Sequence, residues 1–224
     1  MKDKLLTLYT NRHQDFKNVR GQFTDADLHG PFLMSPNENY SRQKNPLLIV
    51  GQETYGWSKS ADDLNKNMED YQRFNVGKTD SYSSPFWNVT RKIEAAIGNE
   101  AYSCAWTNIS KYDVDGGRAY GKYEIAISSL DNLLADEIKI IKPKVCMFFT
   151  GPAFDERIKN IFPDVSFQQM QDWSTRQLSQ LKHPNLPELS FRTYHPKYLR
   201  RSGLEPKFIN FINFITKSIN NPNN

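Results

Sequence analysis

Several polar residues that can do chemistry follow the apolar segments of this chain. Glu53 comes just after the apolar run 46–51, Asn108 lies near the end of the run 102–109, and His195 follows the run 190–194. A carboxylate can stabilise a developing positive charge or orient water, and an imidazole can donate a hydrogen bond to a developing anion. A carboxamide can read the polar edge of a ring, and Tyr55 and Phe86 can stack on its face.

The segments that must position these residues alternate between strand and helix patterns. Continuous apolar runs predict strands at 46–51, 102–109, 144–151 and 190–194. Helical spacing of apolar residues predicts helices at 5–19, 61–74, 85–97, 124–141, 153–161 and 206–219. We therefore expect an α/β fold, a three-layer α/β/α sandwich around a central, mainly parallel four-stranded sheet. Ligands of such sheets bind beyond the carboxyl ends of the strands, where the polar residues stand.

The length of 224 residues fits a single domain over residues 1–224. Residues 1–45 are expected to form an N-terminal helix followed by a long ordered loop, and residues 46–215 to form the core. The stretch 162–189 has no clear pattern, and residues 220–224, rich in Asn, are expected to fray.

Taken in order, five segments resemble the motifs of the uracil-DNA glycosylase superfamily. Gly51-Gln-Glu-Thr-Tyr55 is similar to its first motif, commonly Gly-Gln-Asp-Pro-Tyr, and Tyr194-His-Pro-Lys197 matches the start of its His-Pro-Ser motif. Pro85-Phe-Trp-Asn88 resembles the segment that supplies a base-stacking Phe, and Trp106-Thr-Asn-Ile109 resembles the strand end that supplies an Asn. The unit 138–151 resembles the helix and strand before the last motif.

The resemblance implies cleavage of the bond between deoxyribose and a base that has left the DNA stack. Glu53 would act on the sugar or on water, and His195 on the departing anion. The implied base-binding residues are Gln52, Tyr55, Phe86 and Asn108, with Asn108 reading the base edge, Phe86 stacking and Tyr55 excluding a 5-methyl group. The implied DNA-binding residues are Lys197, Leu199, Arg200 and Arg201, with Leu199 as a wedge into the duplex and the cations on phosphates.

The sequence departs from the family at both catalytic motifs. Glu53 replaces Asp, which adds one methylene to the activating side chain, and Thr54 replaces a turn-setting Pro. After His195 the small phosphate-binding residues give way to a longer, cationic segment. The departures leave open which base is recognised.

Composition and cysteine usage narrow the cofactors and the partners. The chain has 29 basic and 25 acidic residues, and the resulting net charge of +4 permits a nucleic-acid partner without requiring one. With two cysteines, Cys104 and Cys146, and no metal-ligand spacing of histidines, we expect no disulfide framework, iron–sulfur cluster or metal site. No phosphate-binding glycine motif follows a strand, so no nucleotide cofactor is expected.

The expected partner is DNA, single- or double-stranded. No apolar run approaches the ~18 residues that cross a bilayer, so we expect no membrane partner. The cysteine usage indicates a reducing, cytoplasmic location, and we expect a monomer.

Other interpretations fit the same residues. The fold can carry a degenerate pocket that only binds DNA or a base, or a site that hydrolyses a small-molecule nucleoside. Taken singly, Glu53 can cap backbone amides, Asn108 can serve a turn, and His195 can be structural. Phe86 can belong to the core, and residues 197–201 can form a solvated surface.

Overall fold

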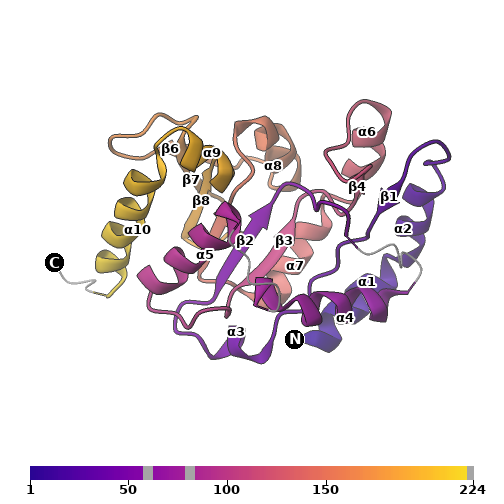
Figure 1. Ribbon diagram of the computed structural model, residues 1–224, viewed down its shortest axis with the longest axis horizontal. Coiled ribbons are helices and arrows are strands. Elements are labelled where there is room, and N and C mark those ends of the chain that lie inside the picture. Colours follow the sequence, from indigo (N-terminus) through magenta and orange to yellow (C-terminus); the bar gives the residue numbers. More distant parts are fainter. Residues whose placement is uncertain (58–62, 79–83, 221–224) are drawn as a thin grey trace.

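The computed structural model describes residues 1–57, 63–78 and 84–220, and its centre is a β-sheet (Figure 1). Four strands of this sheet are mutually parallel, which confirms the predicted parallel core. They are β3 (Ala105–Asn108), β2 (Leu47–Gly51), β5 (Val145–Phe148) and β8 (Leu189–Thr193), in that spatial order. β2 and β5 are buried along their whole length, as expected for strands covered on both faces.

The sheet has six strands, so the predicted four-stranded sheet was too small. β7 (Leu178–Lys182) pairs antiparallel with β8, and β6 (Ser166–Gln169) pairs antiparallel with β7 at the sheet edge. Both fall in the stretch that had no clear pattern. β6 is largely exposed and polar, and β7 mixes polar with apolar residues, so neither forms the continuous apolar run that marks a covered strand.

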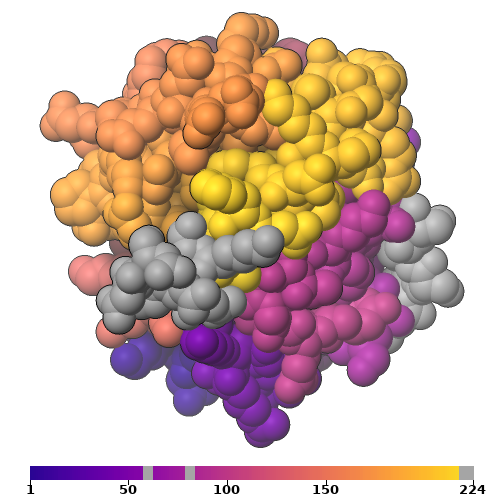
Figure 2. Space-filling view, turned by 90° about the vertical axis from the view of Figure 1, so that its left-hand side faces the viewer, coloured from indigo at the N-terminus to yellow at the C-terminus, as the bar shows by residue number. Residues whose placement is uncertain are grey.

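Helices cover both faces of the sheet, which gives a three-layer α/β/α arrangement (Figure 1). α5 (Pro85–Ala96), α9 (Pro196–Arg201) and α10 (Glu205–Asn220) pack together on one face. α7 (Leu133–Ile141) and α8 (Asp155–Ile161) cover the other. Figure 2 shows α10 lying between α5 and the chain that carries β6 and β7.

Two helices that the periodicity predicts as single segments are broken in the structure. The predicted helix 5–19 is divided at Arg12 into α1 (Lys2–Asn11) and α2 (His13–Arg20). The predicted helix 124–141 is divided into α6 (Lys122–Ser128) and α7. At the second break the buried Asp131 binds Arg157, and short polar side chains such as Asp131 and Asn132 favour non-helical turns.

The remaining elements frame the sheet at its ends. They are β1 (Leu28–His29), α3 (Glu38–Arg42), α4 (Leu64–Phe74), β4 (Asp113–Val114) and the short 3₁₀ turns η1 (Asn75–Gly77) and η2 (Pro152–Phe154). β1 and β4 form a separate two-stranded antiparallel sheet, so the predicted long loop 22–45 contains a strand and a helix. The first residues of the predicted helix 61–74, and residues 221–224 of the predicted frayed tail, lie outside the described residues.

One connected apolar core lies between the layers and includes the buried chain segment Phe32–Met34 from the N-terminal part. In the described part of the chain, every helix is too short or too polar to span a bilayer.

Candidate active site

A cavity of about 480 Å³ lies at the carboxyl ends of β2 and β3 and is open to solvent. The strand order places β3 and β5 on opposite sides of β2, and the crevice outside such a point is where α/β sheets bind ligands. In Figure 1, the carboxyl end of β2 points to the upper edge of the molecule, between α9 and α6. Glu53, Phe86, Asn108 and His195, predicted from four separate segments, all line this one cavity.

Asn108 is held in a fixed orientation at the end of β3. Its side chain is buried, with only 1% exposed, and its Oδ1 lies 3.2 Å from Nε1 of Trp106. Because an indole N–H can only donate, the atom facing it must be the carboxamide oxygen. Gly51, paired with Asn108 across the sheet, leaves room for this oxygen, since a Cβ there would come within 2.2 Å of it. The Nδ2 group is therefore turned away from Trp106, and it has no hydrogen-bond partner among the described residues.

Glu53 stands in the turn that follows β2. Its Oε2 is buried and has no hydrogen-bond partner in the described part of the chain. Burial raises the pKa of the Glu53 carboxyl to about 7, and the nearby charges of Arg118 and Arg157 partly oppose this rise. A carboxyl with such a pKa exchanges a proton near neutral pH, which suits a catalytic base.

The turn that carries Glu53 is held by Asp113 of β4. This fully buried carboxylate accepts hydrogen bonds from the Thr54 hydroxyl (2.6 Å) and from the Gly56 backbone N–H (3.1 Å) through Oδ2. Its Oδ1 lies 2.8 Å from Nδ1 of His29 on the paired strand β1. The two-stranded sheet β1–β4 thus fixes the position of the Glu53 turn.

His195 forms the N-terminal cap of α9. Its Nδ1 accepts a hydrogen bond from the Lys197 backbone N–H at 3.1 Å, so in the neutral ring the proton is on Nε2. Burial, together with the positive charge of Lys197, lowers the pKa of His195 to about 4. At neutral pH this residue is therefore an uncharged imidazole that can donate a hydrogen bond from Nε2.

Aromatic rings form much of the remaining wall. Phe86 lies 5.6 Å from the His195 ring and 6.0 Å from the Trp106 ring, measured between centroids. Trp106 also contacts the other aromatic residues of the cavity, namely Trp57, Phe74 and Trp87. Such a wall can take a flat, partly apolar ring against its faces and edges.

The other two predicted base-binding residues also line the cavity. The Gln52 side chain donates from Nε2 to the Thr150 carbonyl at 2.7 Å, which ties the Glu53 turn to the end of β5. Tyr55 is 90% exposed, so it lies at the rim and is not the buried wall that exclusion of a methyl group from a base pocket requires.

The segment predicted to bind DNA forms α9, with only Lys197 lining the cavity. Leu199 is fully buried in the core, so the prediction of a duplex wedge is wrong. The helix turns Leu199 inward, while Arg200 and Arg201 remain exposed. Arg200 pairs with Glu205 at 2.8 Å, which leaves its charge partly neutralised.

Sequence reasoning missed several residues of the cavity. Trp57 lies in a polar segment, and Phe74 is the last residue of the predicted helix 61–74, so neither was expected in the cavity wall. Asp113, which holds the Glu53 turn, lies between the predicted strand 102–109 and the predicted helix 124–141. Trp106 begins the segment that resembles the Asn-bearing strand end, but no role of its own is predicted for it. The signal that was available is the spacing Trp106-x-Asn108, because alternate residues of a strand lie on the same face.

Among the described residues, no three His, Cys, Asp or Glu side chains are grouped so that they could hold a metal ion, and Cys104 and Cys146 are buried free thiols. The cavity is thus described by its carboxyl, imidazole, carboxamide and aromatic groups. No protein-family model and no curated protein sequence matches this chain, so its chemistry must be inferred from the cavity itself.

Proposed function

We propose that this protein is a DNA glycosylase that hydrolyses the N-glycosidic bond of uracil or another altered, oxo-bearing base. The observation that carries the proposal is that Glu53 and His195, far apart in sequence, line one cavity together with Asn108 and Phe86. A carboxyl, a neutral imidazole donor, a fixed amide donor and an aromatic wall are the groups that this reaction requires.

In the proposed reaction, the bond between the sugar and the base breaks and its electron pair leaves with the base. Positive charge develops on the deoxyribose, where the ionised Glu53 stabilises it and accepts a proton from the attacking water. Water oxygen then bonds to the sugar carbon, which leaves an abasic site. The departing base carries negative charge on its carbonyl oxygen, to which the N–H of His195 donates.

Asn108 supports the choice of an oxo-bearing base. Its Oδ1 is engaged by Trp106, so Nδ2 is the group that remains to bind the base. An amide N–H donates to a ring carbonyl and faces another donor when the base carries an exocyclic amine. Uracil carries a carbonyl at the ring position where cytosine carries its exocyclic amine, and hypoxanthine and xanthine carry one where adenine carries its amine.

The test is base release from labelled oligonucleotides containing uracil, hypoxanthine or xanthine, followed by alkaline cleavage at abasic sites. Both single- and double-stranded forms are used. Glu53→Gln and His195→Gln are each expected to slow release by about 100-fold or more, because each removes a group that acts only in the transition state.

Matched controls exist for both variants. Nδ1 of His183 accepts a hydrogen bond from the backbone N–H two residues further along the chain, as Nδ1 of His195 does. His183 lies outside the cavity, so His183→Gln is expected to keep full activity. Glu156→Gln, at an exposed ion pair on α8, serves the same purpose for Glu53. Failure to release any of the three bases from either form would refute the proposal.

Two other functions, DNA or base binding and nucleoside hydrolysis, would use the same cavity without this reaction. Salt-dependent DNA binding without base release, unaffected by Glu53→Gln, would indicate a binding protein. Release of a base from free nucleosides but not from oligonucleotides would indicate a nucleoside hydrolase.

A further inference from the structure

Exposed tyrosines stand at and beside the rim of the cavity, on both of its sides. Tyr55 lines the rim and is 90% exposed, and its ring lies beside Gly116. Tyr120, 69% exposed, follows in the same connection before α6. On the α9 side, Tyr198 is 40% exposed and packs against Tyr194 in a tilted arrangement, with ring centroids 4.4 Å apart. Large aromatic rings left in water mark a surface that binds something flat and partly apolar.

Cations accompany these rings. The Arg201 guanidinium lies 5.3 Å from the Tyr198 ring centroid, and the Arg118 guanidinium lies 5.6 Å from that of Tyr120. The exposed Lys197 lines the cavity itself. Tyrosine faces interleaved with positive charges are the composition of surfaces that stack bases while holding the phosphate backbone.

Among the described residues, the cavity also has no aliphatic side chain of the kind predicted to open a duplex. Leu199 is buried, and none of the described residues that line the cavity is aliphatic. Extruding a base from a duplex requires unstacking and unpairing, and this requirement is smallest for a base that is already unpaired.

We propose that the cavity takes its base from single-stranded DNA, with the neighbouring bases stacked on Tyr55 and Tyr198. The proposal rests on the proposed function for the identity of the nucleic acid, and it adds the strand state of the substrate. The strand crosses the mouth of the cavity between α9 and the connection to α6. Lys197 and Arg201, both exposed, lie on the α9 side of this path and can contact its phosphates, whereas Arg118 on the other side is paired with Glu124 at 3.0 Å.

The test measures binding, which does not depend on turnover. Fluorescence anisotropy compares a labelled mixed-sequence oligonucleotide of about 15 nucleotides, without an altered base, in single-stranded form and annealed to its complement. The single strand is expected to bind at least about tenfold more tightly. Tyr55→Leu and Tyr198→Leu are each expected to weaken single-strand binding by about tenfold, because leucine keeps an apolar surface but cannot stack.

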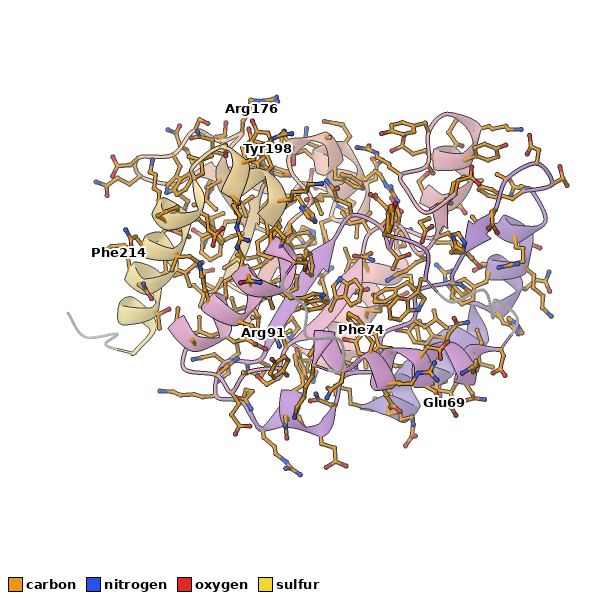
Figure 3. The ribbon with its side chains drawn as sticks, viewed as in Figure 1. Glu69, Phe74, Arg91, Arg176, Tyr198 and Phe214 are labelled. Carbon is orange, nitrogen blue, oxygen red and sulfur yellow. The ribbon has the colours of Figure 1, made fainter. Side chains whose placement is uncertain are left out.

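The controls separate stacking from other effects. Tyr198→Phe keeps the ring and is expected to bind as the original protein does. Phe214 is equally aromatic and 68% exposed, and Figure 3 shows it on α10, well away from Tyr198 at the top of α9, so Phe214→Leu is expected to change nothing. Thermal unfolding of each variant verifies that it is folded.

Equal or tighter binding of the duplex, or unchanged binding in both leucine variants, would overturn the inference. Its failure can be distinguished from failure of the proposed function. Preferential single-strand binding without release of any base would contradict the glycosylase function and support this inference. Base release together with tighter binding of the duplex would support the glycosylase function and contradict this inference.

Discussion

Burial moves the two central titratable groups of the cavity in opposite directions. The pKa of Glu53 rises to about 7 and that of His195 falls to about 4, because burial disfavours the charged form of each. Above pH 7 the cavity therefore holds a carboxylate and a neutral imidazole. In the proposed reaction, the carboxylate stabilises the sugar cation and the neutral imidazole stabilises the departing anion.

The first residue-scale prediction concerns pH. Because the ionised form of Glu53 is the active form, the acid limb of kcat/KM for base release is expected near pH 7 instead of near 4.5, its ordinary carboxyl value. His195 is neutral across this range and adds no second limb. Single-turnover rates between pH 5 and pH 9 measure the profile, with Glu156→Gln as control. A flat profile from pH 5 upward would contradict the assignment.

The second residue-scale prediction concerns Trp106. Trp106→Phe removes the donor that orients the Asn108 carboxamide, so the amide can turn and present its oxygen to the base. We expect discrimination between uracil and cytosine, measured as the ratio of kcat/KM values, to fall by about tenfold, the value of one hydrogen bond. Trp87→Phe makes the same substitution in a ring 5.1 Å from Trp106 without touching that bond, and is expected to retain the ratio.

At the scale of elements, the local pattern of apolar residues predicted the strands that are covered on both faces and missed the two strands at the edge of the sheet. β5 is a continuous apolar run, and a run of this kind can be recognised without knowing its partners. β6 is polar and exposed, and it is a strand only because β7 supplies its hydrogen bonds. Edge strands of this type depend on pairing between residues distant in sequence.

The element-scale prediction concerns the connection between β4 and the Glu53 turn. Asp113→Asn replaces one accepting oxygen of a buried carboxylate by an N–H₂ donor, which leaves either the donors of the turn or the His29 ring without its acceptor. We expect the free energy of unfolding to fall by about 1–3 kcal/mol. The rate of base release should fall as well, because the turn loses its anchor.

Urea unfolding and single-turnover rates measure the two effects of Asp113→Asn. Asp172→Asn, at an exposed carboxylate, is the matched control and should change neither. A stable Asp113→Asn protein with unchanged activity would show that the turn is fixed by other contacts.

For the whole molecule, a buried polar network joins the N-terminal helix to the sheet and to α7. Lys111 and Glu137 form an ion pair at 2.7 Å, and neither side chain has any exposed surface. Glu137 also accepts hydrogen bonds from Tyr9 of α1 (2.9 Å) and Thr107 of β3 (2.8 Å). This network holds α1, β3 and α7 together, close to the strand end that carries Asn108.

The whole-molecule prediction is a loss of stability when that network is broken. Lys111→Met leaves the buried Glu137 charge without its cation and is expected to lower the free energy of unfolding by about 3–5 kcal/mol. Adding Glu137→Gln removes the unpaired charge, and its single amide oxygen can still accept a hydrogen bond from either Tyr9 or Thr107, so the double variant should recover part of the loss. Urea denaturation measures both, and additive losses would contradict the coupling.

The sequence by itself determined the parallel strands and the polar residues that follow them. It did so because apolar runs and the residues next to them are local features of the sequence. The carboxyl ends of parallel strands lie at one edge of the sheet, which is where Glu53, Asn108 and His195 line the cavity. Only the tertiary structure decided that Leu199 faces the core, that Trp106 orients Asn108, and that Asp113 holds the Glu53 turn. These depend on which distant segments pack together, and burial in that packing sets the protonation of the cavity.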